Sequence, residues 1–373
     1  MKNSLKVIAY YLPQYHAIPE NDEWWGRGFT EWVNVKKAQP LFKGHMQPKV
    51  PAQELGYYDL LNDNVRRKQA ELAKEAGIDG FCYWHYWFGN GKELLEKPFK
   101  MTLKDKDNNF GFCLGWANES WKAKQWNKDG SGDKMLIEQS YPGREDDDAH
   151  FYAYLDAFKD DRYIKYDGKP VFLIYRPMNH PHIAEFIARW NYLAKENRLS
   201  DGFCFIAELS ANHTIEDVNY YLGLGFSYVT RVRKDMGHAS FTRQCLYCLK
   251  NFILRRPIRV IDYNSFIKWG YTTSDNKMGF LPNITPNWDH SPRSGRKCTV
   301  LHDSTPELFY KYAKKTLEIN KNGSNLPFLF IKSWNEWGEG NYMEPDITNG
   351  KGYIEALKRA IEFVYNLKEE TND

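Results

Sequence analysis

The chain has 373 residues, and its 51 Lys and Arg against 48 Asp and Glu leave a formal net charge of +3. A charge this small gives little field to hold a nucleic-acid backbone, so the composition argues against a nucleic-acid partner. Hydrophobic residues make up 42% of the chain and charged residues 27%, which is typical of a folded globular protein. Aromatic residues reach 16%. A core absorbs much of that share, and we expect the rest to line a concave surface for flat, half-apolar ligands.

The sequence carries no pattern of a membrane span, because no run approaches the roughly 20 apolar residues that one needs. Residues 1–4 lead directly into a strand-like run without the features of a signal peptide, so we expect a cytoplasmic protein. A secreted protein that has lost its leader would look the same. Three cysteines lie in apolar runs, which favours buried free thiols in a reducing compartment: Cys82, Cys113 and Cys204. Cys245 and Cys248 have no second pair at zinc-site spacing, and we expect no metal and no cofactor.

Short apolar runs alternate with helical patterns along the chain. We interpret eight runs as strands: 7–12, 80–86, 110–117, 170–175, 203–209, 226–232, 280–284 and 327–333. The helical patterns are 65–76, 93–103, 147–158, 183–197, 215–222, 306–319 and 354–365. The runs are continuously apolar, as expected for strands covered on both faces. This order predicts a single (β/α)8 TIM barrel domain over residues 1–373 with a frayed tail at 368–373, and a doubly wound open sheet is the alternative.

Capping residues mark the ends of several predicted helices. Asn64 is expected to cap the first helix, and Gly77 to follow it in a left-handed conformation. Thr305 is expected to cap a later helix, with Pro306 at its first position. Three connections are too long for ordinary turns, and we interpret them as long functional insertions between strand and helix: 13–63, 119–144 and 233–261.

Aromatic, acidic and amide residues follow nearly every predicted strand. In a barrel of this type the active site lies at the carboxyl ends of the strands. Aromatic faces stack on sugar rings, and carboxylates and amides bind hydroxyl groups. We therefore predict substrate contacts from the strand ends and the first long loop: Tyr10, Tyr11, Glu31, Trp32, Tyr83, Trp84, His85, Tyr86, Trp116, Asn118, Glu119, Tyr175, Arg176, Glu208, Trp288, Trp334, Asn335 and Trp337. The alternative is that these rings cap the barrel core, and for His85 the two interpretations are evenly balanced.

The segment Trp334-Asn-Glu336-Trp-Gly-Glu339-Gly340 follows the last predicted strand. If it turns helically, the two carboxylates point to one side. Glycosidic cleavage needs such a pair, because one group protonates the leaving oxygen while the other supplies electrons or acts as a base. Neighbouring indoles would exclude water and raise the proton affinity of one carboxyl group. Glu336 and Glu339 are therefore the predicted catalytic residues, and a solvated acidic turn is the alternative.

Several motifs in this order resemble those of the WbsX-like family, often labelled glycosyltransferases of surface-polysaccharide clusters. The motifs are Ala9–His16 (AYYLPQYH), Gly28–Trp32 (GFTEW), Gly44–Pro48 (GHMQP), Leu55–Asp59 (LGYYD), Gly80–Trp87, Trp116–Glu119 (WANE) and Trp334–Gly340. The resemblance covers almost the whole chain. The family is in turn similar to glycoside hydrolase family 99, the endo-α-mannosidases and mannanases. This more distant link rests mainly on the barrel and the two glutamates.

The hydrolase resemblance implies retaining cleavage of an α-glycosidic, manno-configured bond in an oligosaccharide or polysaccharide. Glu336 would remove the proton of the sugar's own 2-hydroxyl, which attacks the anomeric carbon to give a 1,2-anhydro sugar. Glu339 would protonate the leaving oxygen and later activate water. The residues alone leave open an ordinary double displacement in which Glu119 or Glu208 is the partner of Glu336.

Two other functions compete with hydrolysis. The first is glycosyl transfer in surface-polysaccharide biosynthesis (O-antigen or capsule), although Asp105-Lys-Asp107 lies in a charged loop and Gly89–Lys92 lacks phosphate-loop spacing. The second is a non-catalytic glycan-binding barrel, against which the intact carboxylate pair argues. The segment 233–261 interleaves basic and apolar residues. This pattern is compatible with weak contact to an anionic membrane surface or a lipid-linked glycan, or with an insertion packed on the barrel.

Overall fold

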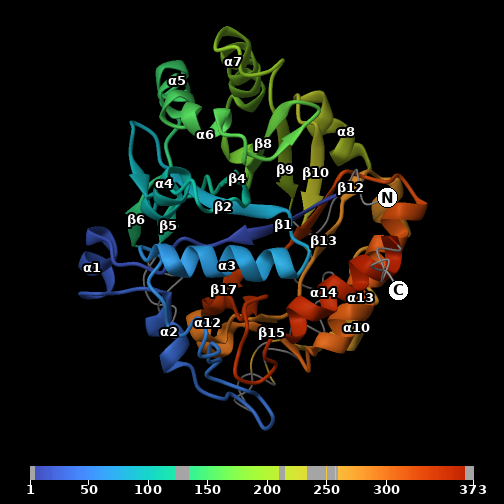
Figure 1. The fold of residues 1–373 in the computed structure, drawn as a ribbon. Coiled ribbons are helices and arrows are strands. Elements are labelled where there is room, and N and C mark those ends of the chain that lie inside the picture. The colour runs from blue at the N-terminus through green and yellow to red at the C-terminus, as the bar shows by residue number, and fades with distance from the viewer. Residues whose placement is uncertain are drawn as a thin grey trace.

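A computed structural model describes residues 5–122, 134–209, 215–232, 249, 257 and 259–365. Its centre is a sheet of parallel strands in the order β12-β10-β9-β8-β4-β2-β1-β16-β13 (Figure 1). The strands are β1 (Lys6–Tyr11), β2 (Gly80–Trp87), β4 (Gly111–Trp116), β8 (Lys169–Ile174), β9 (Cys204–Leu209), β10 (Tyr228–Arg231), β12 (Phe280–Leu281), β13 (Asn283–Ile284) and β16 (Phe328–Ile331). All eight predicted runs coincide with these strands.

The run at 280–284 closes the barrel. Its first half, β12, pairs with β10, while its second half, β13, pairs with β16. Pro282 lies between the two halves, and its carbonyl accepts a hydrogen bond from the amide of Phe330 at 2.8 Å. Proline has no amide to donate, so the ladder changes partner there. The predicted (β/α)8 barrel is confirmed, and an open sheet is excluded.

Helices cover the outside of the barrel (Figure 1). They are α3 (Asp63–Glu75), α4 (Lys97–Lys104), α5 (Arg144–Ala153), α6 (Leu155–Lys159), α7 (Ile183–Glu196), α8 (Ile215–Gly223), α10 (Tyr263–Phe266), α11 (Thr273–Lys277), α13 (Pro306–Asn322) and α14 (Gly352–Tyr365). Among the described residues, none of the helices is long and apolar enough to cross a bilayer.

The caps agree with the sequence except at one position. The Thr305 side chain accepts from the amide of Leu308 and Pro306 opens α13, as predicted. Gly77 has φ +82° directly after the C-cap of α3. The residue that caps the start of α3 is Asn62, whose side chain accepts from the Asn64 amide, so the prediction of Asn64 as the cap was wrong.

Two helical patterns are also interrupted. The pattern at 93–103 starts as a two-residue strand, β3 (Glu93–Leu94), and becomes helical only at Lys97. The pattern at 147–158 is divided between α5 and α6 at Tyr154.

The long connections form small elements around the barrel mouth. The first contains α1 (Pro19–Trp25) and α2 (Glu31–Lys37), and the second contains the pair β5 (Trp121–Lys122) and β6 (Met135–Ile137). A three-stranded sheet joins β11 (Arg259–Asp262), β15 (Thr299–His302) and β14 (Trp288–Asp289). The remaining short elements are β7 (Lys165–Tyr166), η2 (Pro177–Asn179), α12 (Ser291–Ser294), η3 (Gly295–Lys297), β17 (Asn335–Glu336), η4 (Trp337–Glu339) and β18 (Asn341–Tyr342). Most of the basic segment at 233–261, and the pair Cys245 and Cys248, lie outside the described residues.

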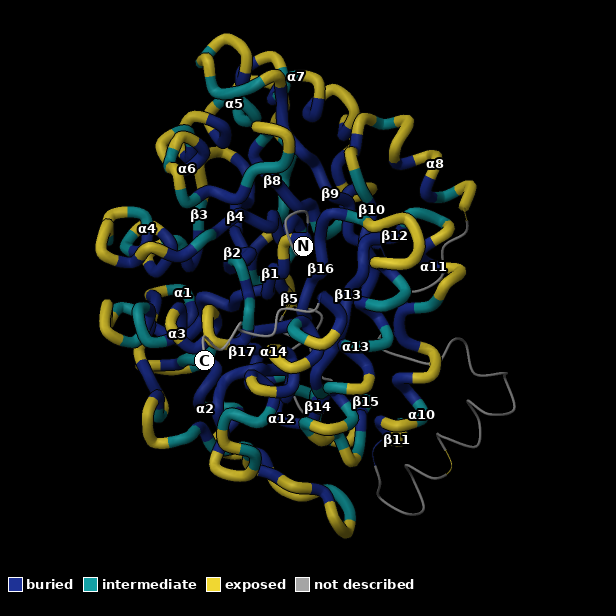
Figure 2. The backbone as a smooth tube through the Cα atoms, turned by 45° about the vertical axis from the view of Figure 1, so that its right-hand side comes forward, coloured by how far each residue is buried: buried dark blue, intermediate teal, exposed yellow. Residues whose placement is uncertain are grey.

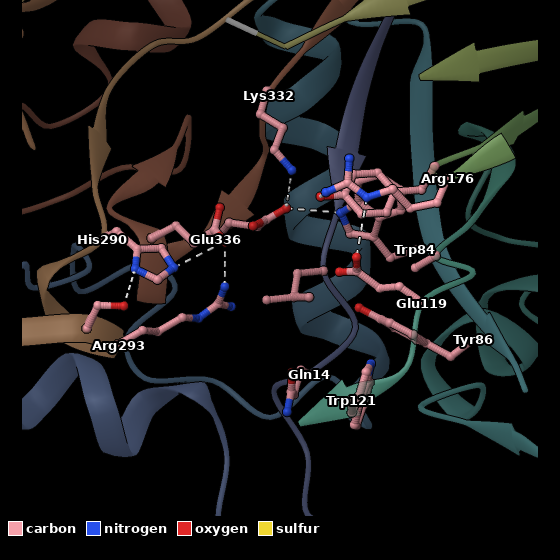
Figure 3. Close-up of a pocket in the computed structure, with 15 residues that line it drawn as sticks. Gln14, Trp84, Tyr86, Glu119, Trp121, Arg176, His290, Arg293, Lys332 and Glu336 are labelled. Carbon is pink, nitrogen blue, oxygen red and sulfur yellow. Dashed lines mark hydrogen bonds and ion pairs between the residues drawn. The ribbon is translucent and has the colours of Figure 1, made fainter. Parts of the chain in front are cut away.

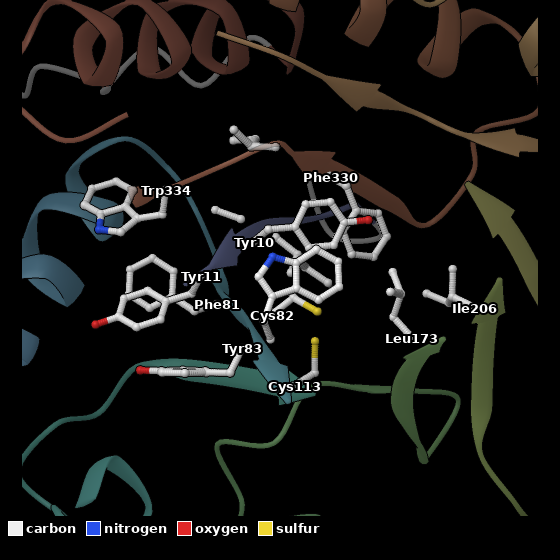
Figure 4. Packing of buried hydrophobic residues seen from close by; sticks show 14 of the residues in the cluster. Tyr10, Tyr11, Phe81, Cys82, Tyr83, Cys113, Leu173, Ile206, Phe330 and Trp334 are labelled. Atoms are coloured by element: carbon white, nitrogen blue, oxygen red, sulfur yellow. The ribbon is translucent and has the colours of Figure 1, made fainter. Parts of the chain in front are cut away.

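The core lies on both sides of the strands. The barrel strands are buried along their length, and exposed residues concentrate on the outer helices (Figure 2). Figure 4 shows Tyr11, Phe81, Tyr83 and Trp334 gathered on one side of the strands, with Tyr10, Cys82 and Phe330 on the other. Cys82, Cys113 and Cys204 are buried free thiols, as the apolar runs predicted.

We predict that Gly80→Ala lowers the free energy of unfolding by about 1–3 kcal/mol, because a Cβ at this position would overlap the Gly111 carbonyl of the paired strand. Denaturant titration measures the change. Gly223→Ala is the matched control, because a Cβ there meets no atom within 4 Å and alanine favours the helix. An unaltered denaturation midpoint in Gly80→Ala would contradict the close strand approach.

Candidate active site

A cavity of about 420 Å³ opens where the barrel strands end (Figure 3). Its walls come from segments far apart in sequence: Leu12 and Gln14 after β1, Trp84 and Tyr86 of β2, Ala117, Glu119 and Trp121 after β4, Tyr175 and Arg176 after β8, His290, Arg293 and Ser294 beyond β13, and Lys332, Glu336 and Glu339 after β16. Aromatic rings, carboxylates and cations therefore share one concave surface.

Glu336 is buried and is held from two directions. The indole Nε1–H of Trp84 donates to its Oε1 at 3.0 Å, and the Lys332 ammonium donates to the same oxygen at 3.2 Å (Figure 3). The ammonium also lies over the rings of Tyr10 and Trp84, at 5.3 and 5.0 Å from their centroids. These contacts offset the cost of burying both charges.

Glu339 is held by a different set of groups. Arg293 Nη1 donates to its Oε1 at 2.7 Å, and His290 Nε2 lies 3.7 Å from the same oxygen. The His290 ring is oriented through Nδ1, which is 2.7 Å from the Ser294 hydroxyl. The two acids thus face one cavity in distinct environments.

The electrostatics of the pair are strongly perturbed. Burial raises the pKa of Glu336, and the charge of Glu339 and a hydrogen bond with it raise the pKa further, against the opposing effect of Lys332 and Arg293. Burial alone would lower the pKa of Lys332, but Glu336, Glu339 and Glu208 outweigh it, so that the pKa is raised. The lysine therefore stays charged beside an acid that holds its proton more tightly than usual.

The turn that carries the acids is tied to the first strand. Asn335 Oδ1 accepts from the Leu12 amide at 2.7 Å, and its Nδ2 donates to the Leu12 carbonyl at 3.0 Å. The Tyr15 hydroxyl donates to the Asn335 carbonyl at 2.6 Å and accepts from the Trp337 amide at 3.0 Å. Gly340 closes the turn at φ +53°, where a Cβ would collide with Asp289. These contacts leave the carboxylates little freedom of position.

A buried carboxyl group behind the site anchors the same turn. Glu344 accepts from Trp337 Nε1 at 2.6 Å, from the Tyr58 hydroxyl at 2.8 Å and from Gln69 Nε2 at 2.6 Å. Burial raises the pKa of Glu344 to about 7, although the hydrogen bonds oppose that shift. The indole of Trp337 is therefore fixed behind the turn.

Seven of the predicted site residues line the cavity: Trp84, Tyr86, Glu119, Tyr175, Arg176, Glu336 and Glu339. Three others lie directly behind its wall. Tyr10 stacks on Trp84 at 4.8 Å, Glu31 binds Arg293 at 3.0 Å, and Glu208 acts electrostatically on Lys332.

The other ten predicted contacts do not line this cavity. They are Tyr11, Trp32, Tyr83, His85, Trp116, Asn118, Trp288, Trp334, Asn335 and Trp337. Successive side chains of a strand point to opposite faces. Tyr11 and Tyr83 therefore face the outer helices, where they reach Gln69 and Thr102.

His85 is likewise a core residue. Its Nε2 is 2.7 Å from His150 Nε2 in α5, and burial lowers the pKa of His85 to about 3. Trp116 donates to the Trp87 carbonyl at 2.9 Å, and Asn118 Nδ2 donates to the Arg176 carbonyl at 2.8 Å. These side chains hold strand ends together rather than face a substrate.

The tryptophans follow the same pattern. Trp32 donates to the Tyr58 carbonyl at 2.8 Å, and Trp334 packs on Phe81. Trp288 lines a second cavity of about 360 Å³. Trp337 and Asn335 support the turn as described above.

The sequence analysis missed Gln14, Trp121, His290, Arg293, Ser294 and Lys332. Lys332 stood inside the last predicted strand run, four residues before Glu336, and that spacing was the available signal. Arg293 follows a proline in the four-residue helix α12, where nothing local marks it. Among the described residues, we find no group of three or more His, Cys, Asp or Glu that could hold a metal ion.

Comparisons with known proteins bear on both the family and the fold. The family model described as "Glycosyltransferase WbsX" matches residues 7–357. WxcX proteins of two Xanthomonas campestris pv. campestris strains are 34% and 33% identical over 369 residues, which is 95% of this chain and 49% of each relative. The chain thus spans about half the length of these relatives.

Solved structures with this fold are more distant in sequence. A glycoside hydrolase family 99 endo-α-mannosidase from Bacteroides thetaiotaomicron, in complex with bis-tris propane, superposes with a TM-score of 0.56 at 14% identity, covering 97% of both chains. A glycoside hydrolase-like protein gives a TM-score of 0.60 at 14% identity, covering 96% of this chain and 94% of the other. At this identity the likeness shows the fold.

We predict that Glu344 makes stability depend on pH. Its pKa rises from 4.5 to about 7 on folding, so its contribution is complete below about pH 4.5 and is lost as the pH rises through 7. The free energy of unfolding of the wild type relative to Glu344→Gln should therefore fall by about 3 kcal/mol between pH 4.5 and 8. Urea titrations at both pH values measure it. The control Glu75→Gln, which alters a solvent-exposed ion pair with Lys351, should give no such slope.

Proposed function

The chain belongs to the family described as glycosyltransferase WbsX, and on that premise we propose that this carbohydrate-active barrel hydrolyses an α-linked, manno-configured glycosidic bond with retention of configuration. The observation that carries the proposal is the pair Glu336 and Glu339 on one wall of an aromatic cavity. The likeness in fold to a family 99 endo-α-mannosidase supports the choice of reaction.

The cavity supplies what a sugar needs for binding. Trp84, Tyr86, Trp121 and Tyr175 offer aromatic surface that suits the C–H faces of pyranose rings. Gln14, Glu119 and Arg176 offer polar groups for hydroxyls, and Arg176 is positioned by the Tyr175 hydroxyl at 2.9 Å and by Glu119 at 3.4 Å. An oligosaccharide is the ligand class that matches both surfaces.

In the proposed reaction Glu336 is the base and Glu339 the acid. Glu336 takes the proton of the sugar 2-hydroxyl as that oxygen bonds to the anomeric carbon, while Glu339 gives its proton to the departing glycosidic oxygen. The 1,2-anhydro sugar is then opened by water, whose proton goes to Glu339, and Glu336 returns its proton to O2. The Lys332 and Trp84 donors stabilise the carboxylate form of Glu336, while burial keeps its pKa raised, so that its carboxylate is a stronger base than an ordinary one.

The placement of both acids on one short turn supports this route over ordinary double displacement. Retaining enzymes that use a carboxylate nucleophile hold their two carboxyl groups roughly 5 Å apart across the anomeric carbon. Glu336 and Glu339 instead lie three residues apart on one short turn, and the charge of Glu339 raises the pKa of Glu336. Glu119 is the acid of this cavity that a double displacement would recruit as the partner of Glu336, whereas Glu208 does not line the cavity.

We expect Glu336→Gln and Glu339→Gln each to lower kcat by about 10²–10⁴-fold while leaving oligosaccharide binding within a few-fold, because each removes a proton transfer and preserves shape. Reducing-end release from manno-configured oligosaccharides and calorimetric binding measure the two effects. The control Glu307→Gln changes an exposed ion pair with Arg359 and should retain wild-type activity. Full turnover by either site variant would refute the mechanism, and binding without any cleavage by the wild type would favour a glycan-binding barrel.

Glycosyl transfer is the second candidate, because the matching family carries that description. A nucleotide-sugar donor usually needs a divalent ion, but Asp105 and Asp107 are paired with Arg67 at 2.8 and 3.2 Å and do not line the cavity.

Thermal shift distinguishes the two reactions. We expect the melting temperature to rise with manno-configured oligosaccharides or 1-deoxymannojirimycin and to stay constant with nucleoside diphosphates plus Mg²⁺ or Mn²⁺, since binding to the native state alone stabilises it. Stabilisation by the nucleotides and metal would favour transfer.

A further inference from the structure

We propose that Glu31 acts through Arg293 to keep one proton on the Glu336–Glu339 pair throughout the reaction, which makes Glu31 a positioning residue of this site. The inference rests on the proposed function and deepens it. Glu31 belongs to the Gly28–Trp32 motif, and this role in the reaction is separate from the substrate contact that the sequence predicted for it.

Glu31 forms a buried ion pair with Arg293. It opens α2, is fully buried, and receives both Nε and Nη2 of Arg293 at 3.0 Å. The same guanidinium reaches Glu339 through Nη1 at 2.7 Å. Arg293 therefore bridges the two carboxylates with separate nitrogen atoms.

The glycine between the two acids allows this approach. A Cβ on Gly338 would occupy the space of the Glu31 carboxylate and would also press on Arg293. The helix α2 packs against η4 and α12, so Glu31, Arg293 and Glu339 meet from three elements. The close approach of Glu31 and Arg293 therefore explains why residue 338 is a glycine, without any sugar contact at this position.

The charges around the pair favour a bound proton. Three carboxyl groups, Glu31, Glu336 and Glu339, contact two permanent cations, Arg293 and Lys332, and a fourth, Glu208, acts electrostatically on Lys332. Other titratable neighbours are His290 beside Glu339, and Tyr15 and Tyr86, whose pKa values are raised mainly by burial and further by Glu31 and Glu336, respectively. The carboxyl groups therefore outnumber the cations, and burial raises the pKa of Glu31 as well as that of Glu336, although Arg293 opposes both shifts. This excess of negative charge favours a proton on one of the carboxyl groups, and without Glu31 the excess is smaller.

One shared proton is also what the proposed reaction uses. In the first step Glu336 gains a proton as Glu339 loses one, and in the second step the transfers reverse. The pair holds one proton at every stage, so its total charge stays constant. If Glu31 keeps one proton on the pair, neither step of the reaction needs to exchange a proton with solvent.

The test is the pH dependence of kcat/KM. Glu31→Gln should move the alkaline limb to lower pH by about one unit or more, because removal of a nearby negative charge weakens proton retention. Arg293→Gln should move the same limb to higher pH. Glu31→Asp keeps the charge and should keep the wild-type limb even if kcat falls. The distant control Glu307→Gln should leave the whole profile unchanged.

A second readout does not depend on turnover. Carbon-13 NMR of protein labelled at the Glu carboxyl carbons gives this readout, with the signals assigned from Glu336→Gln and Glu339→Gln. In the wild type, the pair should keep one proton above neutral pH. In Glu31→Gln, the pair should lose that proton at a lower pH than in the wild type. Unchanged titration and unchanged limbs in both Glu31→Gln and Arg293→Gln would overturn the inference. A wild-type protein that titrates as described but cleaves no glycan would instead overturn the proposed function. Circular dichroism verifies folding, and if one variant does not fold, the other still tests the sign of the shift.

Discussion

The architecture of this site depends on the compensation of buried charge. An ionised group taken out of water loses several kcal/mol of hydration, and only close opposite charges and hydrogen bonds restore it. Glu31, Glu336 and Glu339 are held by two cations, Arg293 and Lys332, within one barrel mouth. Glu31 is the first residue of α2 in the connection after β1, Arg293 lies in α12, and Lys332 directly follows β16. Barrel closure is what brings these three segments together.

Polar ties to the backbone make the site rigid. The Asn335 side chain forms hydrogen bonds with both the amide and the carbonyl of Leu12. Glu344 accepts hydrogen bonds from Trp337, Tyr58 and Gln69. Each of these groups is buried, so each would be costly to leave without a partner. The turn with the two acids is therefore positioned by the barrel frame rather than by its own short sequence. Such support is what a site needs to hold reacting groups to within a fraction of an ångström.

The alternating direction of side chains along the strands explains which of the predicted substrate contacts line the cavity. In β2, Trp84 and Tyr86 point into the barrel mouth, while Tyr83 and His85 point to the helices. All four are aromatic and all are buried, so composition alone does not distinguish the two faces. One known inward residue would have been enough to assign the others, because side chains alternate strictly along a strand.

The sequence by itself determined the barrel, its eight strands and the segment with the paired acids, because apolar runs and the Trp-Asn-Glu-Trp-Gly-Glu-Gly turn are local patterns. Only the tertiary structure decided which rings face the cavity and which cations meet the acids. Arg293 lies 262 positions from Glu31 and 46 from Glu339, and no periodicity relates residues so far apart. Their meeting follows from closure of the sheet between β13, β16 and β1. Ion pairs between residues far apart in sequence form only in the closed fold, so local sequence patterns do not predict them.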